Sequence, residues 1–438
     1  MKQIIFFLHI LLLLTACASS RGALHSSENS SKNSSENSPE NAPENAPQNA
    51  PENALQIISV LPSSAQPVNS PSALAARLDS LCADSIFDRT QLGLAVYDLT
   101  DGRYLYRRGE RQCLRPASTM KVVTAIAALH TLGTDYHYST RLVLPDGAVA
   151  KGDSIVRGNI EIRAAFDPLL SKDDLQTLVA ALAAEGVRRI EGDIVADVSL
   201  KDTLAKGWGW CWDDDDAPLD ALTMGGKDIF ETSFRQLLAD NGIVCSGTFR
   251  KGRLTPGGRT VASVERTIDA VLLPMMKKSD NLAAESMFYQ IAAHGGKPYA
   301  GRREAVKAIE ALVKKMGLNP AHYQFADGSG LSLYNYVTPE LLVRLLAFAY
   351  NDEALRRHLL PALPIAGEDG TLARRLRGTK AQGNVRAKTG TVEGVSTLAG
   401  YCTAKDGHIL CFAIMNQGIR RTATGRNFQD RVCRALTD

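Results

Sequence analysis

The sequence predicts an α+β protein: a five-stranded antiparallel sheet covered by helices, with a second α/β domain inserted into the same chain. Two hairpin patterns predict the sheet, because alternating apolar stretches around Asp-Gly turns occur near both ends of the folded part. An almost continuously apolar helix follows the first hairpin. A mixed strand and helix segment separates that helix from later amphipathic helices, which predicts the insertion.

The elements of the sheet domain come from both ends of the chain. Residues 91–110 predict a hairpin that turns at Asp101-Gly102, and residues 385–416 predict three strands, the last two joined at Asp406-Gly407. Antiparallel strands from the two ends can form one sheet, on which the apolar helix packs. The flanking helices are predicted at residues 73–82 and 425–436.

The middle of the chain has a different pattern. From residue 139 to 259 it predicts two strands, a helix at 172–185, a further strand, a tryptophan-rich loop and another helix. This segment is expected to be an inserted domain with its own small core. Amphipathic helices return at 271–293 and 300–316. The predicted sheet domain therefore comprises residues 73–138 and 260–438.

Residues 1–17, MKQIIFFLHILLLLTAC, have one positive charge, a short apolar run and small residues before Cys17. The run is too short to span a bilayer and is typical of a cleaved export signal. The ending LTAC resembles the bacterial lipoprotein box, which implies a lipid on Cys17 and a membrane tether. An ordinary signal peptide cut near Ala16 is the alternative. The predicted location is the periplasm, and Ala18 favours the outer over the inner membrane by analogy.

The next segment, residues 18–72, is rich in Ser, Asn, Glu and Pro and contains the repeat SPENAPENAPQNAPENA. It has few apolar residues to bury, so a disordered tether is expected. The whole chain of 438 residues has a net charge of only +3 and no basic stripe with interleaved aromatics. Nucleic acid is therefore not expected as a partner.

The cysteines and histidines do not form a metal-binding pattern. Seven cysteines remain if Cys17 is lipidated, an odd number that leaves at least one thiol free. There is no Cys-x-x-Cys or His-x-x-x-His pair. Buried apolar thiols are expected, and neither a metal nor a cofactor is predicted.

A serine precedes a lysine by three residues at the start of the apolar helix, in RPASTMKVVTAIAALHTL. Pro116 and Ser118 are typical helix-start residues, and Gly133 is a typical stop. Residues three apart lie on one face of a helix, so the Ser118 hydroxyl and the Lys121 amine can meet. Taken alone, the pair is more simply an N-cap serine followed by a snorkelling lysine.

Two further motifs favour a catalytic interpretation. Ser279, Asp280 and Asn281 begin a predicted helix, and Lys388-Thr389-Gly390-Thr391 opens a predicted strand. Separately, they could be a helix cap and a strand start with a glycine bulge. All three motifs in this order, on these elements, are improbable by chance. The same set occurs in penicillin-binding proteins and class A β-lactamases.

The three motifs suit acyl transfer. A serine hydroxyl is a weak nucleophile until a base removes its proton, and Lys121 can do so if burial and a second cation keep it neutral. Lys388 would supply that cation and hold a substrate carboxylate. Ser279 would relay the proton to the leaving amine, and Asn281 would hydrogen-bond Lys121 or the substrate.

The lysine-threonine-glycine strand is expected to bind substrate through Thr389, Gly390 and Thr391. The backbone N–H groups of Ser118 and Thr391 would form the oxyanion hole. Gly390 would let a substrate strand approach the edge of the sheet and bind as an added strand.

On these motifs the chain resembles the D-alanyl-D-alanine carboxypeptidase/endopeptidase family of class C low-molecular-mass penicillin-binding proteins, the penicillin-binding protein 4 type. The resemblance covers residues 73–436 and includes the stretches GVRRIEGDIVAD, GWGWCWDD, DGSGLS and AKTGT. It implies a DD-peptidase/β-lactamase-like sheet domain, with the insertion between the Ser-x-x-Lys and Ser-x-Asn motifs. It also implies an acidic substrate-binding residue in the tryptophan-rich loop. Asp214 is the match, with the register among residues 213–216 left open.

Three features depart from the pattern of the family. The insertion is short, which predicts one inserted domain rather than two. Leu333 follows DGSGLS where many members have a basic residue, and Glu393 follows KTGTV where a neutral amide is common. Leu333 can also be a simple packing residue. The diamino acid that the site prefers at the third position of the stem peptide is therefore left open.

The resemblance implies a serine-type D-Ala-D-Ala carboxypeptidase and endopeptidase that acts on peptidoglycan through an acyl-enzyme on Ser118. β-Lactams would acylate the same serine, since they mimic the D-alanyl-D-alanine terminus. One alternative is a β-lactamase, although the segment between Lys121 and Ser279 lacks a Glu-x-x-Leu-Asn deacylation motif. The other is a non-catalytic lipoprotein that only binds peptidoglycan.

Overall fold

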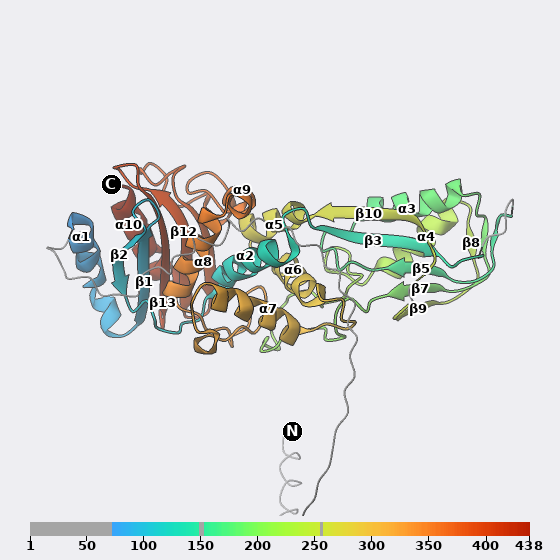
Figure 1. Cartoon of the computed structure of the whole chain (residues 1–438), viewed down its shortest axis with the longest axis horizontal. Helices are drawn as coiled ribbons and strands as arrows, with labels where there is room; N and C mark the ends of the chain where they lie inside the picture. Colours follow the sequence, from blue (N-terminus) through green and yellow to red (C-terminus); the bar gives the residue numbers. More distant parts are fainter. Residues whose placement is uncertain (1–71, 149–152, 255–256) are drawn as a thin grey trace, which may run out of the picture. The chain divides into compact units, whose positions relative to one another are not determined.

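The computed structural model describes residues 72–148, 153–254 and 257–438 (Figure 1). The predicted signal peptide, the lipidated Cys17 and nearly all of the tether lie outside the described residues, so these remain predictions. No helix in the described part of the chain is long and apolar enough to cross a membrane.

A five-stranded antiparallel sheet forms the centre of the first domain, as the sequence predicts. The strand order is β11-β12-β13-β1-β2, so strands from the two ends of the chain meet where β13 pairs with β1. Ala413 lies opposite Ala95 in that pair, and Lys388 lies opposite Ala399 at the β11 edge. The strands are β1 (Gln91–Asp98), β2 (Arg103–Arg108), β11 (Arg386–Val392), β12 (Val395–Thr403) and β13 (Ile409–Gln417).

Helices bury both faces of this sheet (Figure 1). On β1, Leu94 and Val96 belong to the core beneath α1 (Ala73–Cys82) and α10 (Thr422–Thr437), whereas Ala95 and Tyr97 belong to the core on the opposite face. Alternate side chains of a strand point to opposite faces, which explains why seven consecutive residues of β1 are buried. The opposite face is covered by α8 (Pro339–Asn351), behind which lies α2 (Met120–Leu132).

The helix predicted at residues 271–293 is in fact two helices. Ser279 has φ +61°, a left-handed conformation that a continuous helix does not permit. The Asp280 side chain then accepts from the Ala283 N–H and caps the second helix. The helices of this region are α5 (Ile268–Lys277), α6 (Asn281–Ala293), α7 (Arg302–Lys315) and α9 (Glu353–Ala362).

In its described residues, 139–148, 153–254 and 257–259, the insertion contains two sheets and two helices. Its first and last long strands, β3 (His137–Leu144) and β10 (Arg259–Thr267), pair antiparallel, so the chain enters and leaves the insertion on neighbouring strands. One sheet has the order β10-β3-β5-β7-β9, and the other has the order β4-β6-β8. The remaining strands are β4 (Ile155–Val156), β5 (Ile160–Arg163), β6 (Arg189–Ile190), β7 (Ile194–Asp197), β8 (Val244–Cys245) and β9 (Phe249–Gly252); the helices are α3 (Lys172–Ala184) and α4 (Phe230–Asp240).

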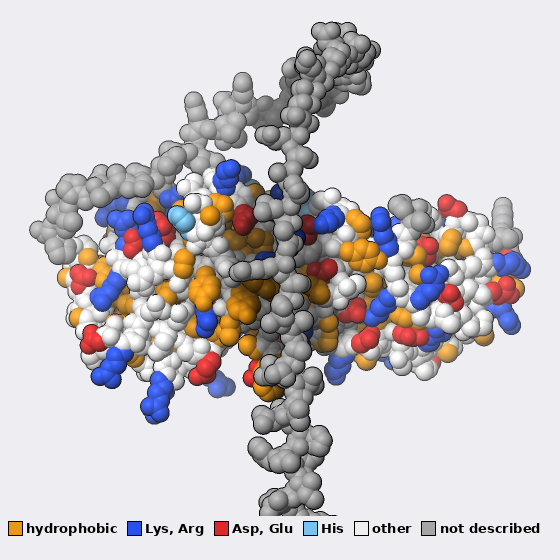
Figure 2. All heavy atoms as spheres, turned by 90° about the horizontal axis from the view of Figure 1, so that it is seen from below, with side chains coloured by type: hydrophobic (Ala, Val, Ile, Leu, Met, Phe, Trp, Pro, Cys, Tyr) orange, Lys and Arg blue, Asp and Glu red, His pale blue; other side chains and the backbone are white. Residues whose placement is uncertain are grey.

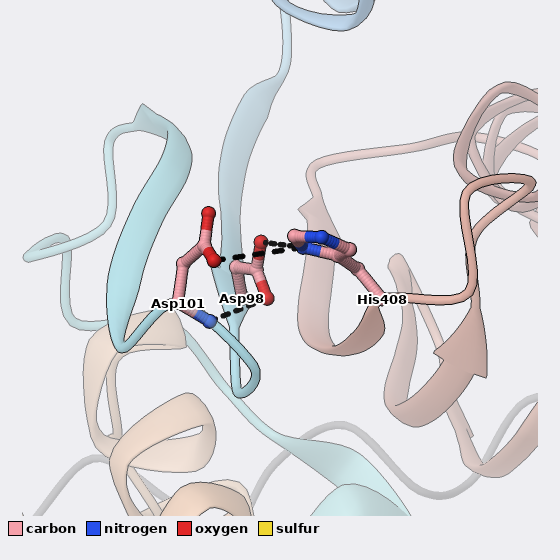
Figure 3. Close-up of side chains that lie close together, drawn as sticks. All are labelled: Asp98, Asp101 and His408. Carbon is pink, nitrogen blue, oxygen red and sulfur yellow. Dashed lines mark hydrogen bonds and ion pairs between the residues drawn. The ribbon is translucent and has the colours of Figure 1, made fainter.

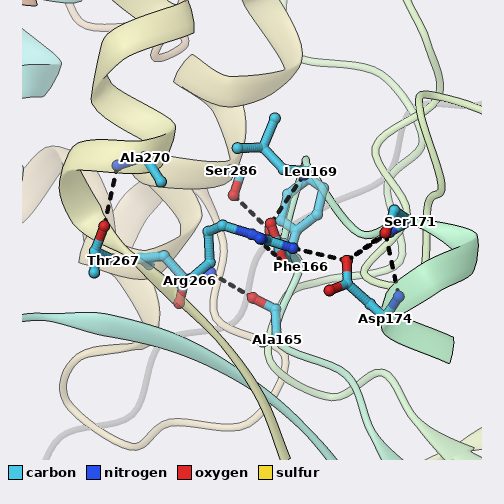
Figure 4. A network of polar contacts seen from close by, with 11 residues as sticks. Ala165, Phe166, Leu169, Ser171, Asp174, Arg266, Thr267, Ala270 and Ser286 are labelled. Carbon is cyan, nitrogen blue, oxygen red and sulfur yellow. Dashed lines mark hydrogen bonds and ion pairs between the residues drawn. The ribbon is translucent and has the colours of Figure 1, made fainter. Parts of the chain in front are cut away.

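A polar network joins the insertion to α6 (Figure 4). Arg266 on β10 contacts the carboxylates of Asp167 at 3.2 Å and Asp174 at 2.7 Å. The Ser286 hydroxyl of α6 donates to the carbonyl of Phe166 at 2.5 Å. Asp167 is almost fully buried, so its charge depends on this pairing. The network fixes the base of the insertion against the helix that carries Asn281.

Charged side chains of both signs are mixed on the described surface, and the cysteines of the described residues form no disulfides. Positive and negative side chains are interspersed on the face shown in Figure 2. The seven cysteines of the described residues are all free thiols. Four of them are buried, as expected, and Cys113 is exposed. The buried four are Cys82, Cys402, Cys411 and Cys433.

Three side chains at the ends of the β1–β2 and β12–β13 hairpins lie close together (Figure 3). His408 Nδ1 lies 2.7 Å from Asp98 Oδ2, and the other oxygen of Asp98 accepts from the N–H groups of Thr100 and Asp101. Asp98 raises the pKa of His408 through this contact. Both oxygens of the buried Asp98 carboxylate therefore have hydrogen-bond partners, and the contact between Asp98 and His408 links the two hairpins.

The turn that carries Ser118 is held between two glycines. A side-chain carbon at Gly330, which has φ +82°, would lie 1.9 Å from the carbonyl oxygen of Ala117. At Gly390 on β11 it would lie 2.1 Å from Thr397 Oγ1 and 2.7 Å from the Pro116 carbonyl. Both glycines therefore permit the close approach that places the Ser118 turn against the sheet.

We expect Gly390→Ala to lower the free energy of unfolding by about 1–3 kcal/mol, because the added methyl group must push β11 away from the turn. Urea denaturation of the two proteins measures this loss. Gly295→Ala is the matched control, since an added carbon there meets nothing within 4 Å. Equal stability losses in the two variants would contradict the close packing at Gly390.

Candidate active site

Ser118 lies in a 3₁₀ turn, Ala117–Thr119, immediately before α2. Ser118 does not cap the helix, which was the alternative interpretation of the Ser-x-x-Lys pair, because Thr119 occupies the cap position and makes no side-chain capping bond. The Ser118 hydroxyl instead accepts a hydrogen bond from Lys121 Nζ at 3.0 Å. Ala117, directly before the serine, has φ +47°, a strained conformation for a residue with a side chain. The tight turn thus aims Ser118 at Lys121 rather than along the helix.

Lys121 is fully buried, and its amine has three acceptors. Besides Ser118, these are Asn281 Oδ1 at 2.6 Å and the Ser329 carbonyl at 2.8 Å. The structure therefore contains the hydrogen bond between Lys121 and Asn281 that the sequence predicts. Three acceptors around one amine fix its position to within a small volume, as a base that acts on a single hydroxyl requires.

The Ser329 carbonyl is itself held by buried carboxylates. Glu285 of α6 accepts from the N–H groups of Gly328 and Ser329, at 3.1 Å and 2.8 Å. Asp327 accepts from five further donors, among them the indole N–H of Trp210 in the insertion at 2.9 Å. The DGSGLS stretch is part of the family resemblance, but the sequence does not predict that its Ser329 carbonyl accepts a hydrogen bond from Lys121. No sequence signal identified Glu285.

The second lysine lies on the opposite side of the site. Lys388 is fully buried, and its amine donates to Ser279 Oγ at 2.9 Å and to the Thr389 carbonyl at 2.8 Å. It is the third residue of β11, so the motif lies within the strand and does not open it. The left-handed backbone at Ser279 is what turns that hydroxyl toward β11 instead of into the helix.

Burial controls the ionisation of both lysines. It lowers the pKa of Lys121 to about 8, although the carboxylates of Asp327 and Glu285 partly oppose the shift. Burial, followed by the charge of Lys121, lowers the pKa of Lys388 well below its usual range. Burial and the neighbouring Asp327 raise the pKa of Glu285 to about 8. Two buried amines with lowered pKa values, beside a carboxyl group with a raised pKa, are typical of a catalytic site.

The tryptophan-rich loop brings an aspartate to the site, but at a different position from the one singled out in the sequence. Asp216 Oδ1 accepts from Asn281 Nδ2 at 2.7 Å. The carboxylate of Asp214 accepts from the backbone N–H of Cys211 at 2.6 Å. A substrate contact by Asp214 therefore stays a prediction, whereas Asp216 is the residue of this loop that orients Asn281.

An open cleft of ≈ 610 Å³ runs along the edge of β11 and exposes Ser118, Ser279, Thr389 and Thr391 together. Thr389 Oγ1 donates to Thr371 Oγ1 at 2.8 Å. Gly390 contributes close packing with the Ser118 turn, a role that was not predicted, while its predicted role in substrate approach remains untested. The other lining residues are Gly370, Thr371, Ala373, Arg374, Arg375, Ala423, Arg426, Asn427 and Asp430.

The two residues that depart from the family pattern differ in their surroundings. Leu333 is half-buried, and its carbonyl accepts from Arg115 Nε at 3.1 Å. Glu393 is exposed in the turn between β11 and β12. Neither residue lines the cleft.

Comparisons with known proteins agree with this geometry. A model of the D-Ala-D-Ala carboxypeptidase 3 (S13) family matches residues 74–229 and 221–438. The D-alanyl-D-alanine carboxypeptidase of Actinomadura sp. (strain R39) is 28% identical over 442 residues, which cover 78% of this chain and 80% of the relative. D-alanyl-D-alanine carboxypeptidase DacB of Haemophilus influenzae is 29% identical over 382 residues, which cover 68% of this chain and 79% of the relative.

The fold is that of a known structure. Penicillin binding protein 4 (dacB) from Haemophilus influenzae superimposes with a TM-score of 0.73 at 23% identity, over 83% of this chain and 98% of that protein. The family model covers almost all of the described residues and all three motifs. The chain therefore belongs to the D-Ala-D-Ala carboxypeptidase 3 (S13) family.

Proposed function

We propose that this protein removes terminal D-alanine from peptidoglycan stem peptides, and also cuts D-alanyl cross-links, through an acyl-enzyme on Ser118. The observation that carries the mechanism is the 3.0 Å contact between Ser118 Oγ and the fully buried amine of Lys121. With a pKa near 8, a useful fraction of this lysine is neutral at neutral pH and can act as a base.

In the first step, neutral Lys121 accepts the proton of Ser118 while the serine oxygen attacks the D-alanyl carbonyl carbon. The negative charge that develops on the carbonyl oxygen would be stabilised by the backbone N–H groups of Ser118 and Thr391. The bond from that carbon to the leaving nitrogen then breaks. Ser279 would relay the proton held by Lys121 to the nitrogen, which leaves as an amine. Lys121, neutral again, would then accept a proton from the water that hydrolyses the ester on Ser118.

The substrate itself would set the charges of the two lysines. In the free protein, burial and the charge of Lys121 both disfavour a cationic Lys388. A substrate carboxylate beside Lys388 and Thr389 would favour the cation. A cationic Lys388 would in turn favour neutral Lys121, the form that can accept the serine proton. Substrate binding would therefore activate the base.

Cleavage of cross-links is supported by the cleft, which is open along β11 and can hold a leaving group larger than D-alanine. The fold is shared with the predatory endopeptidase Bd0816 of Bdellovibrio bacteriovorus, with a TM-score of 0.54 at 17% identity over 79% of this chain and 94% of that protein. Identity at this level concerns the fold alone.

We also propose that the protein is a periplasmic lipoprotein anchored through Cys17, because the apolar run of residues 1–16 ends in the LTAC box. Incorporation of a labelled fatty acid into the wild type, and its loss in Cys17→Ala, would be the expected result. Labelling that persists in Cys17→Ala would contradict the anchor site.

Ser118→Ala should abolish covalent labelling by benzylpenicillin, because no other hydroxyl among the described residues contacts Lys121. Intact-mass spectrometry of the wild type should show one penicilloyl adduct that persists for minutes or longer. An adduct on Ser118→Ala would overturn the assignment of the nucleophile. Drug hydrolysis without a lasting wild-type adduct would indicate a β-lactamase, and neither adduct nor hydrolysis would indicate a binding protein.

Acylation should depend on pH through Lys121. A protonated Lys121 cannot accept the serine proton, so the second-order rate constant for acylation should rise with pH and level off above about 8. Stopped-flow measurements with a fluorescent penicillin between about pH 6 and 10 measure this profile. A rise centred near the ordinary lysine value of 10.5, or a flat profile, would contradict the assigned base.

A further inference from the structure

The cleft beside Ser118 has a positively charged wall that the carboxypeptidase reaction does not use. Three arginines and one aspartate line it: Arg374, Arg375, Arg426 and Asp430. Arg375 is paired with Asp430 at 2.6 Å and is half-buried. In the described part of the chain, no acidic side chain lies within 4.0 Å of Arg374 or Arg426, and both are exposed. Two arginines therefore face the cleft without a negative partner.

We infer that Arg374 and Arg426 form a subsite for the carboxylates of the acceptor stem peptide, the leaving group released when a cross-link is cut. The inference rests on the proposed function, since it assigns the side of the cleft occupied by that leaving group. Guanidinium groups suit this task because they bind carboxylates with two parallel hydrogen bonds.

The position of the wall indicates which part of the substrate it contacts. The 2.8 Å bond between Thr371 and Thr389 places the loop of Arg374 beside the strand that holds the substrate carboxylate. The same loop is anchored by the 2.6 Å ion pair of Lys277 with Asp369. Atoms of a leaving group that extend past Thr389 would therefore meet this fixed wall.

Arg426 lies in the second turn of α10, the helix that the Arg375–Asp430 ion pair joins to the loop of Arg374. Its guanidinium donates to Thr391 Oγ1 at 3.5 Å, which is a weak contact that a carboxylate could replace. The first turn of α10 also lines the cleft through Ala423 and has no side-chain cap. The helix dipole adds to the positive potential of Arg374 and Arg426.

The chemistry of the two leaving groups explains why the wall favours one substrate. Free D-alanine has a single carboxylate, and Lys388 with Thr389 is already placed to hold it. An acceptor stem peptide has several carboxylates along its length. Arg374 and Arg426, which have no acidic partner among the described residues, can bind the carboxylates that lie beyond Thr389. The wall should therefore bias the protein toward cross-link cleavage.

The test compares two substrates in the full chain, solubilised in detergent. Rates of cleavage of a purified tetrapeptide–tetrapeptide muropeptide dimer and of a pentapeptide monomer are measured at low and high salt. The double variant Arg374→Gln/Arg426→Gln is compared with Arg420→Gln, an exposed arginine that does not line the cleft. Titration with benzylpenicillin counts the active sites of each protein, so misfolded enzyme does not enter the rates.

We expect the ratio of dimer to monomer kcat/KM to fall about tenfold in the double variant and to stay unchanged in Arg420→Gln. In the wild type, salt should lower that ratio, because exposed charges are screened. A wild type that cuts dimers, together with an unchanged ratio in the double variant, would overturn the subsite alone. A wild type that releases D-alanine but leaves dimers intact would overturn both the subsite and the proposed cross-link cleavage.

Discussion

The site depends on one buried amine. Lys121 is held by the Ser118 hydroxyl, the Asn281 amide oxygen and the Ser329 carbonyl, which come from three separate segments of the chain. An uncompensated buried charge is costly, so the amine is poised between a cation satisfied by these acceptors and a neutral base. The surrounding fold serves to bring these acceptors to the same point.

The insertion is part of this arrangement. Trp210 donates to Asp327, which shapes the loop whose Ser329 carbonyl meets Lys121, and Asp216 orients Asn281 from its other side. The contact of Ser286 with Phe166 secures the insertion to α6, the helix that begins with Asn281. The insertion thus supports the candidate catalytic groups Lys121 and Asn281 directly.

The two lysines form a coupled pair whose charges are decided by what occupies the cleft. Lys388 has no carboxylate among its hydrogen-bond partners, whereas the surroundings of Lys121 include Asp327 and Glu285. An anionic substrate would supply the missing partner of Lys388. In the inferred subsite, Arg374 and Arg426 likewise lack an acidic partner within the described part of the protein. A negatively charged substrate would supply that partner at a distance from the reacting bond.

The sequence by itself determined the architecture of the sheet and the contact between Ser118 and Lys121. Strand alternation, Asp-Gly turns and residue spacing are local properties, and they sufficed to predict the five strands and the pairing of Ser118 with Lys121. Only the tertiary structure decided that Ser329 supplies an acceptor, that Asp216 reaches Asn281 and that Gly390 packs against the nucleophile turn. These contacts join residues far apart in the chain, such as Lys121 and Ser329, which are 208 positions apart. No local pattern encodes such a distance, because it follows from how helices and sheet pack together.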